Sequence, residues 1–116
     1  MSKYYINAII LDGCGYSKAA NDLLDKYSNI KKQYVFVNYD EKDKYKTELI
    51  QTFPQIYLKK ENSNNNLLLG GYSELQNFIN TFYGKYNDKQ LDEFIRINPR
   101  WSKKGTLRLI ELINNK

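Results

Sequence analysis

The stretch YYINAIIL at Tyr4–Leu11 is followed directly by DGCGYS at residues 12–17. The first stretch is a near-continuous apolar run with the length of a strand, and it suits a central strand that is covered on both faces. Asp12-Gly13 ends this run. From Ser17 to Tyr27, apolar residues then recur at helical spacing, at Ala20, Leu23, Leu24 and Tyr27. We therefore expect a buried strand, a tight turn that carries Cys14, and a helix.

Strands and helices continue to alternate after this unit. Tyr34–Tyr39 (YVFVNY) is rich in β-branched and aromatic residues and predicts a strand. Asp40 is a candidate cap for a helix over about Lys42–Gln51, with Tyr45 and Leu49 facing the core.

The next segment predicts a hairpin followed by a helix. Strands are expected at Gln55–Lys60 and Leu67–Leu69, joined by a turn at Glu61–Asn66. Gly70-Gly71 ends the second strand, and Ser73 is a candidate N-cap for the helix. The apolar face of that helix would consist of Leu75, Phe78, Ile79 and Phe82.

The expected order up to Tyr83 is β-α-β-α-β-β-α. A β-α-β unit implies a right-handed crossover between parallel strands, and the hairpin adds antiparallel strands. The result is an α/β fold, a four-stranded mixed sheet with helices on both faces. This is the thioredoxin-like architecture.

The last third of the chain reads as a basic C-terminal helical extension. We divide the chain into a domain at residues 1–84 and an extension at residues 85–116, packed on the same domain. The first part carries 10 basic and 9 acidic residues, and the second carries 8 and 4. Leu91, Phe94 and Ile95 indicate a helical turn or two, which Asn98-Pro99 interrupts. A final short helix is expected at Thr106–Ile113, with Leu107, Ile110 and Ile113 on one stripe.

The charge of this extension has two readings. In the first, its apolar residues pack on the core and its lysines are solvated. In the second, a basic patch binds an acidic partner or nucleic acid, through Arg96, Arg100, Lys103, Lys104 and Arg108. We favour the first, because the extension contains no recognisable nucleic-acid-binding motif.

Composition excludes several kinds of chemistry. The 116 residues include one cysteine, Cys14, and no histidine. An internal disulfide, a multi-cysteine zinc site and Ser-His-Asp or Cys-His catalysis are therefore excluded. No apolar run approaches the roughly 18 residues of a membrane span, so we expect no membrane association.

The same composition bears on location. We find no signal peptide, and a solitary thiol suits a reducing compartment such as the cytoplasm. Lys, Asn, Ile and Tyr make up 51 of the 116 residues, which indicates an AT-rich genome. If the source is a large DNA virus, packaging in the virion is compatible with this composition.

Cys14 is the candidate reactive group. A thiol at a helix N-terminus lies near unsatisfied backbone N–H groups and the positive end of the helix dipole, and both favour the thiolate. Ser17 lies one helical turn later, where its hydroxyl can donate a hydrogen bond to the sulfur. The alternative is an inert buried cysteine, which is the usual state of a lone intracellular cysteine.

Two further segments complete the candidate site. Pro54 directly precedes a predicted strand, either as an ordinary first residue of the strand or in a cis Phe53–Pro54 bond opposite the thiol. In the second case the backbone of Phe53 would be free to bind an extended peptide. Gly70-Gly71 would allow close approach of a ligand to the following helix N-terminus, which suits a carboxylate.

Together these three segments resemble the glutaredoxin family over about residues 4–84. Cys-Gly-Tyr-Ser (14–17) is similar to the Cys-Gly-Phe-Ser site of monothiol members. Thr-Phe-Pro-Gln (52–55) resembles the family's cis-proline signature, and Gly-Gly-Tyr-Ser-Glu-Leu (70–75) resembles its γ-glutamyl-binding segment. Each motif alone is weak, but all three occur in the family's order and spacing.

The resemblance implies glutathione-dependent thiol–disulfide exchange with glutathionylated thiols, with Cys14 and Ser17 as catalytic residues. It implies a glutathione site made of Cys14, Tyr16, Gln51, Phe53, Pro54, Gly71, Ser73 and Glu74. Monothiol relatives also suggest a second role, in which a homodimer holds a [2Fe–2S] cluster through Cys14 and one glutathione thiolate from each subunit.

The chain departs from the family pattern at two positions. Leu11 stands where the family usually has a lysine that pairs with a glutathione carboxylate, and Ile50-Gln51 stands where monothiol members usually have Trp-Pro. Losing the lysine removes a charge-assisted contact of roughly 1–3 kcal/mol. The alternative function is therefore a non-catalytic binding or structural module that uses the basic extension, and a nucleic-acid-binding protein is a third, weaker reading.

Overall fold

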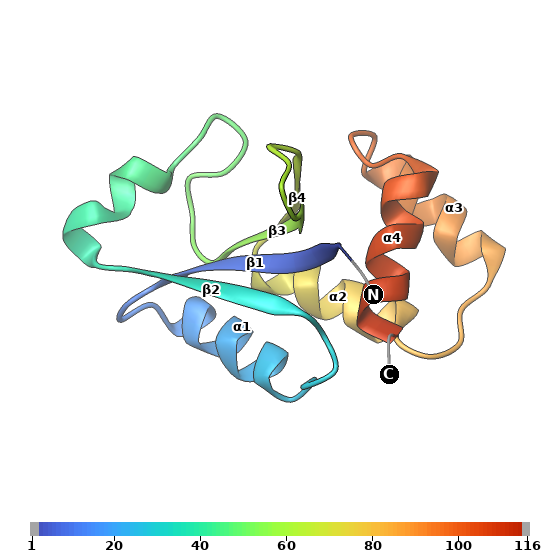
Figure 1. The fold of residues 1–116 in the computed structure, drawn as a ribbon, viewed down its shortest axis with the longest axis horizontal. Helices are drawn as coiled ribbons and strands as arrows, with labels where there is room; N and C mark the ends of the chain where they lie inside the picture. Colours follow the sequence, from blue (N-terminus) through green and yellow to red (C-terminus); the bar gives the residue numbers. More distant parts are fainter. Residues whose placement is uncertain (1–2, 115–116) are drawn as a thin grey trace.

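The computed structural model describes residues 3–114 of the chain (Figure 1). Strands and helices alternate through the first two thirds, and helices alone form the last third. The elements are β1 (Tyr4–Leu11), α1 (Gly15–Asp25), β2 (Lys32–Val37), the 3-10 helix η1 (Tyr39–Tyr45), β3 (Gln55–Lys60), β4 (Asn66–Gly70), α2 (Tyr72–Phe82), α3 (Asp88–Ile97) and α4 (Lys103–Asn114).

The four strands form one mixed sheet in the order β2-β1-β3-β4. β1 pairs in parallel with β2, and it pairs with β3 in antiparallel orientation. β4 pairs with β3 as the second strand of a hairpin. The α/β class, the central place of the first strand and the bounds of β1 and β3 agree with the sequence-based predictions.

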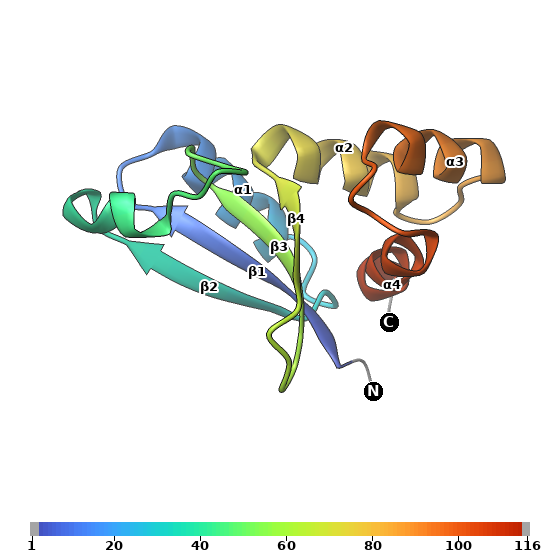
Figure 2. The same ribbon diagram turned by 90° about the horizontal axis from the view of Figure 1, so that it is seen from above.

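Both α1 and α2 pack on the same face of the sheet (Figure 2). Ile6, Ala8 and Ile10 of β1 point to this face and are almost fully buried in one apolar cluster with the two helices. The opposite face carries η1 and the loop after it, which form a smaller cluster around Ile9 and Val37. Helices therefore cover both faces of the sheet, as predicted, with α1 and α2 on one face and the 3-10 helix η1 on the other.

The C-terminal helices contribute to the main apolar cluster rather than lying apart from it. α3 and α4 sit beside one end of the sheet (Figures 1 and 2). Leu91 of α3, Trp101 and four residues of α4 are buried with the residues of β1, α1 and α2; the α4 residues are Leu109, Ile110, Leu112 and Ile113. The indole N–H of Trp101 also donates to the carbonyl of Leu68 in β4, at 3.0 Å.

The helix expected over about Lys42–Gln51 is absent. The segment forms η1 at Tyr39–Tyr45 and then continues without helix, and the Leu49 side chain is 58% exposed. The physical reason is that this stretch has too few apolar residues to make a stripe, whereas its charges pair over short distances, at Lys44–Glu41 and Lys46–Asp43.

Other details of the helices and strands also differ from prediction. β2 begins and ends two residues earlier than expected, at Lys32–Val37, α1 also begins and ends two residues earlier, at Gly15–Asp25, and β4 is longer at both ends, at Asn66–Gly70. α2 begins at Tyr72 with Gly71 as N-cap, because the carboxylate of Glu74 accepts the Gly71 N–H at 2.7 Å, so Ser73 lies inside the first turn. α3 is ten residues long rather than a turn or two, and it ends where Asn98-Pro99 was expected to end it. In α4, Leu107 is exposed, and the buried stripe begins at Thr106 and Leu109.

Within residues 3–114, no helix has the length and hydrophobicity that would let it cross a membrane.

We expect Leu112→Ala to lower the free energy of unfolding by about 2–5 kcal/mol, because Leu112 is 1% exposed and its removal leaves a cavity. The matched control is Leu107→Ala in the same helix, which should change stability by less than about 0.5 kcal/mol because the Leu107 side chain is exposed. Urea unfolding followed by circular dichroism measures both. Equal small effects would show that α4 does not belong to the core.

Candidate functional site

Cys14 lies where β1 passes into α1. Its N–H donates to the Leu11 carbonyl at 3.2 Å and closes the turn, and its own carbonyl accepts from Lys18 N–H at 3.0 Å as the first hydrogen bond of the helix. Cys14 is the N-cap residue of α1 and is partly exposed. The thiol therefore lies at a helix N-terminus, as predicted, and it is not sealed in the apolar core.

Ser17 supports this turn from inside the protein. Its side chain is fully buried, and its hydroxyl oxygen accepts the Leu11 N–H at 3.0 Å. The hydroxyl proton is then available to donate in another direction, and the Ser17 side chain is one of the groups that lower the pKa of the Cys14 thiol. Ser17 thus connects the end of β1 to the thiol.

Burial and hydrogen bonding have opposite effects on the pKa of the Cys14 thiol. Partial burial raises the pKa, because it disfavours the charged thiolate. Hydrogen bonds from the Ser17 N–H, the Ser17 hydroxyl and the Tyr16 N–H lower it, and together they leave the pKa below its ordinary value. Lys18, the nearest lysine in sequence, is paired with Asp22 at 2.9 Å. Hydrogen bonds thus account for the lowered pKa.

The segment at Phe53–Pro54 lies beside the thiol. The peptide bond between these residues is cis, which is the second of the two alternatives that the sequence left open. The Cys14 sulfur lies 3.7 Å from the Phe53 carbonyl oxygen, close enough for the thiol to donate a weak hydrogen bond to it. The Phe53 side chain is buried against Ile9 and Val37, which anchors this loop to the sheet.

The glycine-containing segment meets Pro54 from the other side. A Cβ atom at Gly71 would lie 3.6 Å from the Pro54 carbonyl oxygen and 3.4 Å from Glu74 Oε1. At Gly70, where φ is +137°, a Cβ atom would lie 2.5 Å from Glu74 Cγ. Only glycine fits at Gly70, because the Glu74 side chain folds back over this position to cap α2.

The remaining predicted site residues lie at the surface. Tyr16 is 68% exposed, and its ring centroid lies 6.5 Å from that of Tyr72 in the first turn of α2. Gln51 and Ser73 are also exposed. Tyr72 was not among the predicted site residues, although it stands between two of them in the sequence. Its contact with Tyr16 shows that the first turns of α1 and α2 lie side by side.

The donor set at this site does not by itself fit a metal centre. Cys14 offers one sulfur, and residues 3–114 contain no cluster of three or more Cys, Asp, Glu or His side chains that could hold a metal ion. An iron–sulfur cluster takes four ligands. One copy of the chain could supply only one of them.

Comparisons of this chain with protein-family models, with curated proteins and with solved structures found no match. The functional assignment therefore depends on the geometry of the site and on the sequence motifs.

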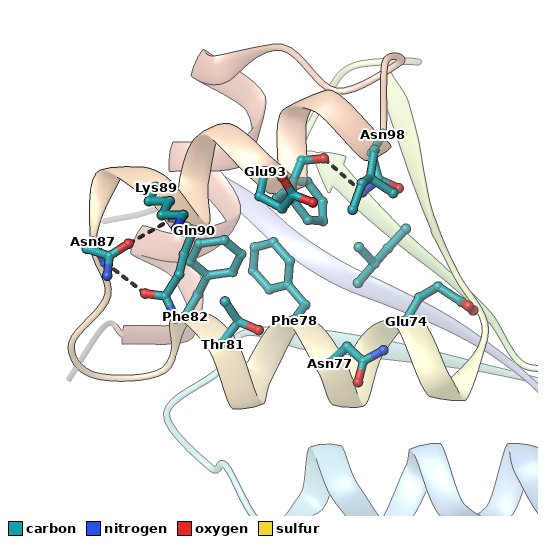
Figure 3. A pocket seen from close by; sticks show the side chains of 13 residues that line it. Glu74, Asn77, Phe78, Thr81, Phe82, Asn87, Lys89, Gln90, Glu93 and Asn98 are labelled. Carbon is teal, nitrogen blue, oxygen red and sulfur yellow. Dashed lines mark hydrogen bonds between the residues drawn. The ribbon is translucent and has the colours of Figure 1, made fainter.

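A hollow of about 690 Å³ lies away from the thiol, between α2 and α3 (Figure 3). Phe78, Phe82 and Phe94 form its apolar floor, with ring centroids 4.7–5.8 Å apart. Glu74 lies at one end of it, whereas Cys14 and Phe53 do not line it. The sequence contains no motif that predicts this hollow, because its two walls come from separate amphipathic helices.

We expect Ser17→Ala to raise the pKa of Cys14, because the substitution removes one of the hydrogen bonds that stabilise the thiolate. The rate of alkylation by iodoacetamide as a function of pH measures this pKa. The matched control is Ser28→Ala at an exposed position, which should leave the pKa unchanged. The same pKa in both variants and the wild type would contradict the role given to Ser17.

The lowered pKa of Cys14 also determines the direction in which the stability of the fold changes with pH. The folded-state pKa of Cys14 lies below the value in the unfolded chain. The thiolate therefore contributes to stability above the unfolded-state pKa, and this contribution is lost as the pH falls through the folded-state pKa.

Proposed function

We propose that the protein is a thioredoxin-like protein of the monothiol glutaredoxin type that catalyses glutathione-dependent thiol–disulfide exchange through Cys14. The observation that carries the proposal is the position of the Cys14 sulfur. It lies at a helix N-terminus with hydrogen bonds that lower its pKa, 3.7 Å from the carbonyl of a residue that precedes a cis-proline. The sheet order and the three motifs in their family order support the same assignment.

The reaction proceeds in two exchange steps. The Cys14 thiolate attacks the glutathione sulfur of a glutathionylated substrate, the substrate thiolate leaves, and a Cys14–glutathione disulfide forms. A second glutathione thiolate then attacks the glutathione sulfur of this disulfide, which releases oxidised glutathione and regenerates the Cys14 thiolate. Because the chain has no second cysteine, it depends on glutathione for the second step.

The surroundings of Cys14 offer groups that suit glutathione. The N–H of Phe53 donates to no described residue, so an extended peptide can pair with the backbone there as an added strand. The N–H groups in the first turn of α2, around Ser73, have no partner within the helix and suit a carboxylate. Tyr16 supplies an exposed ring two residues after Cys14, and Gln51 supplies an exposed amide on the loop before Phe53. A compartment with reduced glutathione, such as the cytoplasm, is where this chemistry would operate.

We expect Cys14→Ser to reduce the glutathione-dependent turnover of a small mixed disulfide of glutathione to the uncatalysed rate, since a serine hydroxyl is not ionised near neutral pH. The fold should survive, because Cys14 lies outside the apolar clusters. Ser28→Ala is the control and should keep full activity. Activity is measured by coupled oxidation of NADPH through glutathione reductase.

Equal inactivity of wild type and Cys14→Ser would instead support the non-catalytic binding module. Leu11 is the feature that favours this second candidate, because a leucine cannot pair with a glutathione carboxylate as the usual lysine does. Replacing it, in Leu11→Lys, should then restore glutathione binding, measured by calorimetry.

The cluster-binding role needs a second subunit and two glutathione thiolates to complete four sulfur ligands. We expect anaerobic reconstitution with iron and sulfide but without glutathione to leave the protein colourless. With glutathione present, a brown dimer would establish the cluster role. A colourless monomer under the same conditions would exclude it and leave thiol–disulfide exchange.

A further inference from the structure

A second hollow, of about 410 Å³, lies at the opposite end of β1 from Cys14. Its walls come from the start of β1, the β3–β4 hairpin and the first two turns of α4. These elements are in close contact, because a Cβ atom at Gly105 would lie only 3.1 Å from a methyl carbon of Leu67. The hollow is therefore built by the C-terminal extension closing against the sheet.

The charged side chains that line this hollow are all positive. Lys60 comes from β3, and Lys104 and Arg108 come from α4. Among the residues of the described range 3–114 that line the hollow, none is aspartate or glutamate. The ion pairs found within that range involve other cations, namely Lys18, Lys31, Lys44, Lys46 and Arg96.

Tyr4 holds two of these cations in place. The Lys60 ammonium lies 5.8 Å from the centroid of the Tyr4 ring, and the Arg108 guanidinium lies 5.4 Å from it. Both distances are within the range of cation–π attraction. Positive charges gathered in one hollow without a carboxylate repel one another, and an anion bound between them would relieve this repulsion.

The uncharged walls restrict the class of anion. The half-buried side chains of Tyr4 and Leu67 offer apolar surface, and the amides of Asn65 and Asn66 can both donate and accept hydrogen bonds. A bare inorganic anion could accept hydrogen bonds from the amides, but it would leave the apolar surface of Tyr4 and Leu67 unused. The volume lies within the roughly 300–1,000 Å³ that is typical of small-ligand sites.

We propose that this hollow binds a free nucleoside phosphate. Its phosphates would lie against Lys60, Lys104 and Arg108, and its base against Leu67 and the two asparagine amides. A free nucleotide suits the hollow better than a nucleic-acid strand, because a strand needs a basic groove that follows several phosphates. The basic side chains of the extension do not form such a groove. Arg96 of α3, for example, is paired with Glu93 at 2.6 Å and does not line this hollow.

The test is calorimetric titration of the full-length protein with ADP at fixed ionic strength. We expect Lys104→Gln and Arg108→Gln each to weaken ADP binding at least about tenfold, because each removes a charge-assisted hydrogen bond to phosphate. Arg96→Gln is the matched control, with the same loss of charge at an exposed site outside the hollow, and should change affinity less than about twofold. Both lost cations are exposed, so the variants should fold, and thermal unfolding checks this.

Three further titrations distinguish the alternatives. Inorganic pyrophosphate should bind at least about tenfold more weakly than ADP, and equal affinity would overturn the nucleoside assignment. A single-stranded 20-mer oligonucleotide that bound more tightly than ADP, with the same variants weakened, would overturn it in favour of nucleic acid. Cys14→Ser should bind ADP as the wild type does, so loss of the proposed exchange activity leaves this site intact. Absence of ADP binding to the wild type would overturn the proposal.

Discussion

Hydrogen bonding of β1 along both of its edges is the constraint on which the rest of the structure depends. Ile9 pairs with Gln55 of β3, and Ile56 of β3 pairs with Gly70 of β4. The end of β1, the start of β3 and the end of β4 therefore lie together at one end of the strands. The segments that carry Cys14, Pro54 and Gly71 follow or precede these paired residues by a few positions, so they meet as well. A change of register in either pair would separate the thiol from the cis-proline loop.

The Cys14 thiol, at this end of the strands, is stabilised in its thiolate form by hydrogen bonds. Ser17 and the first N–H groups of α1 lower the pKa of Cys14 against the opposing effect of burial. Such hydrogen bonds are fixed by the turn and the helix, whereas a long charged side chain would move and would be screened by salt. Under the proposed function, Leu11 stands where glutaredoxins usually have a lysine, so glutathione binding would rely more on backbone groups and on the first turn of α2.

The C-terminal extension presents two different faces along one helix. The buried face of α4 completes the apolar cluster beneath the sheet, through Leu109, Ile110, Leu112 and Ile113. Its other side carries Lys104 and Arg108, which meet Lys60 of β3 across the second hollow. The two readings of the basic extension are thus compatible, because one face of a helix can be core while the other gathers charge.

The sequence by itself determined the alternation of strands and helices, the central apolar strand, the thiol at the turn before α1, and the order of the three motifs. These follow from local periodicity and from residues with distinct backbone preferences, such as glycine and proline. The 3-10 helix at Tyr39–Tyr45, the placement of α1 and α2 on one face, and the contact between Cys14 and Phe53 were decided only by tertiary structure. The tertiary structure alone also brought Lys60 and Arg108 to the same hollow. Residues far apart in sequence come together through strand register and helix packing, which no local pattern encodes.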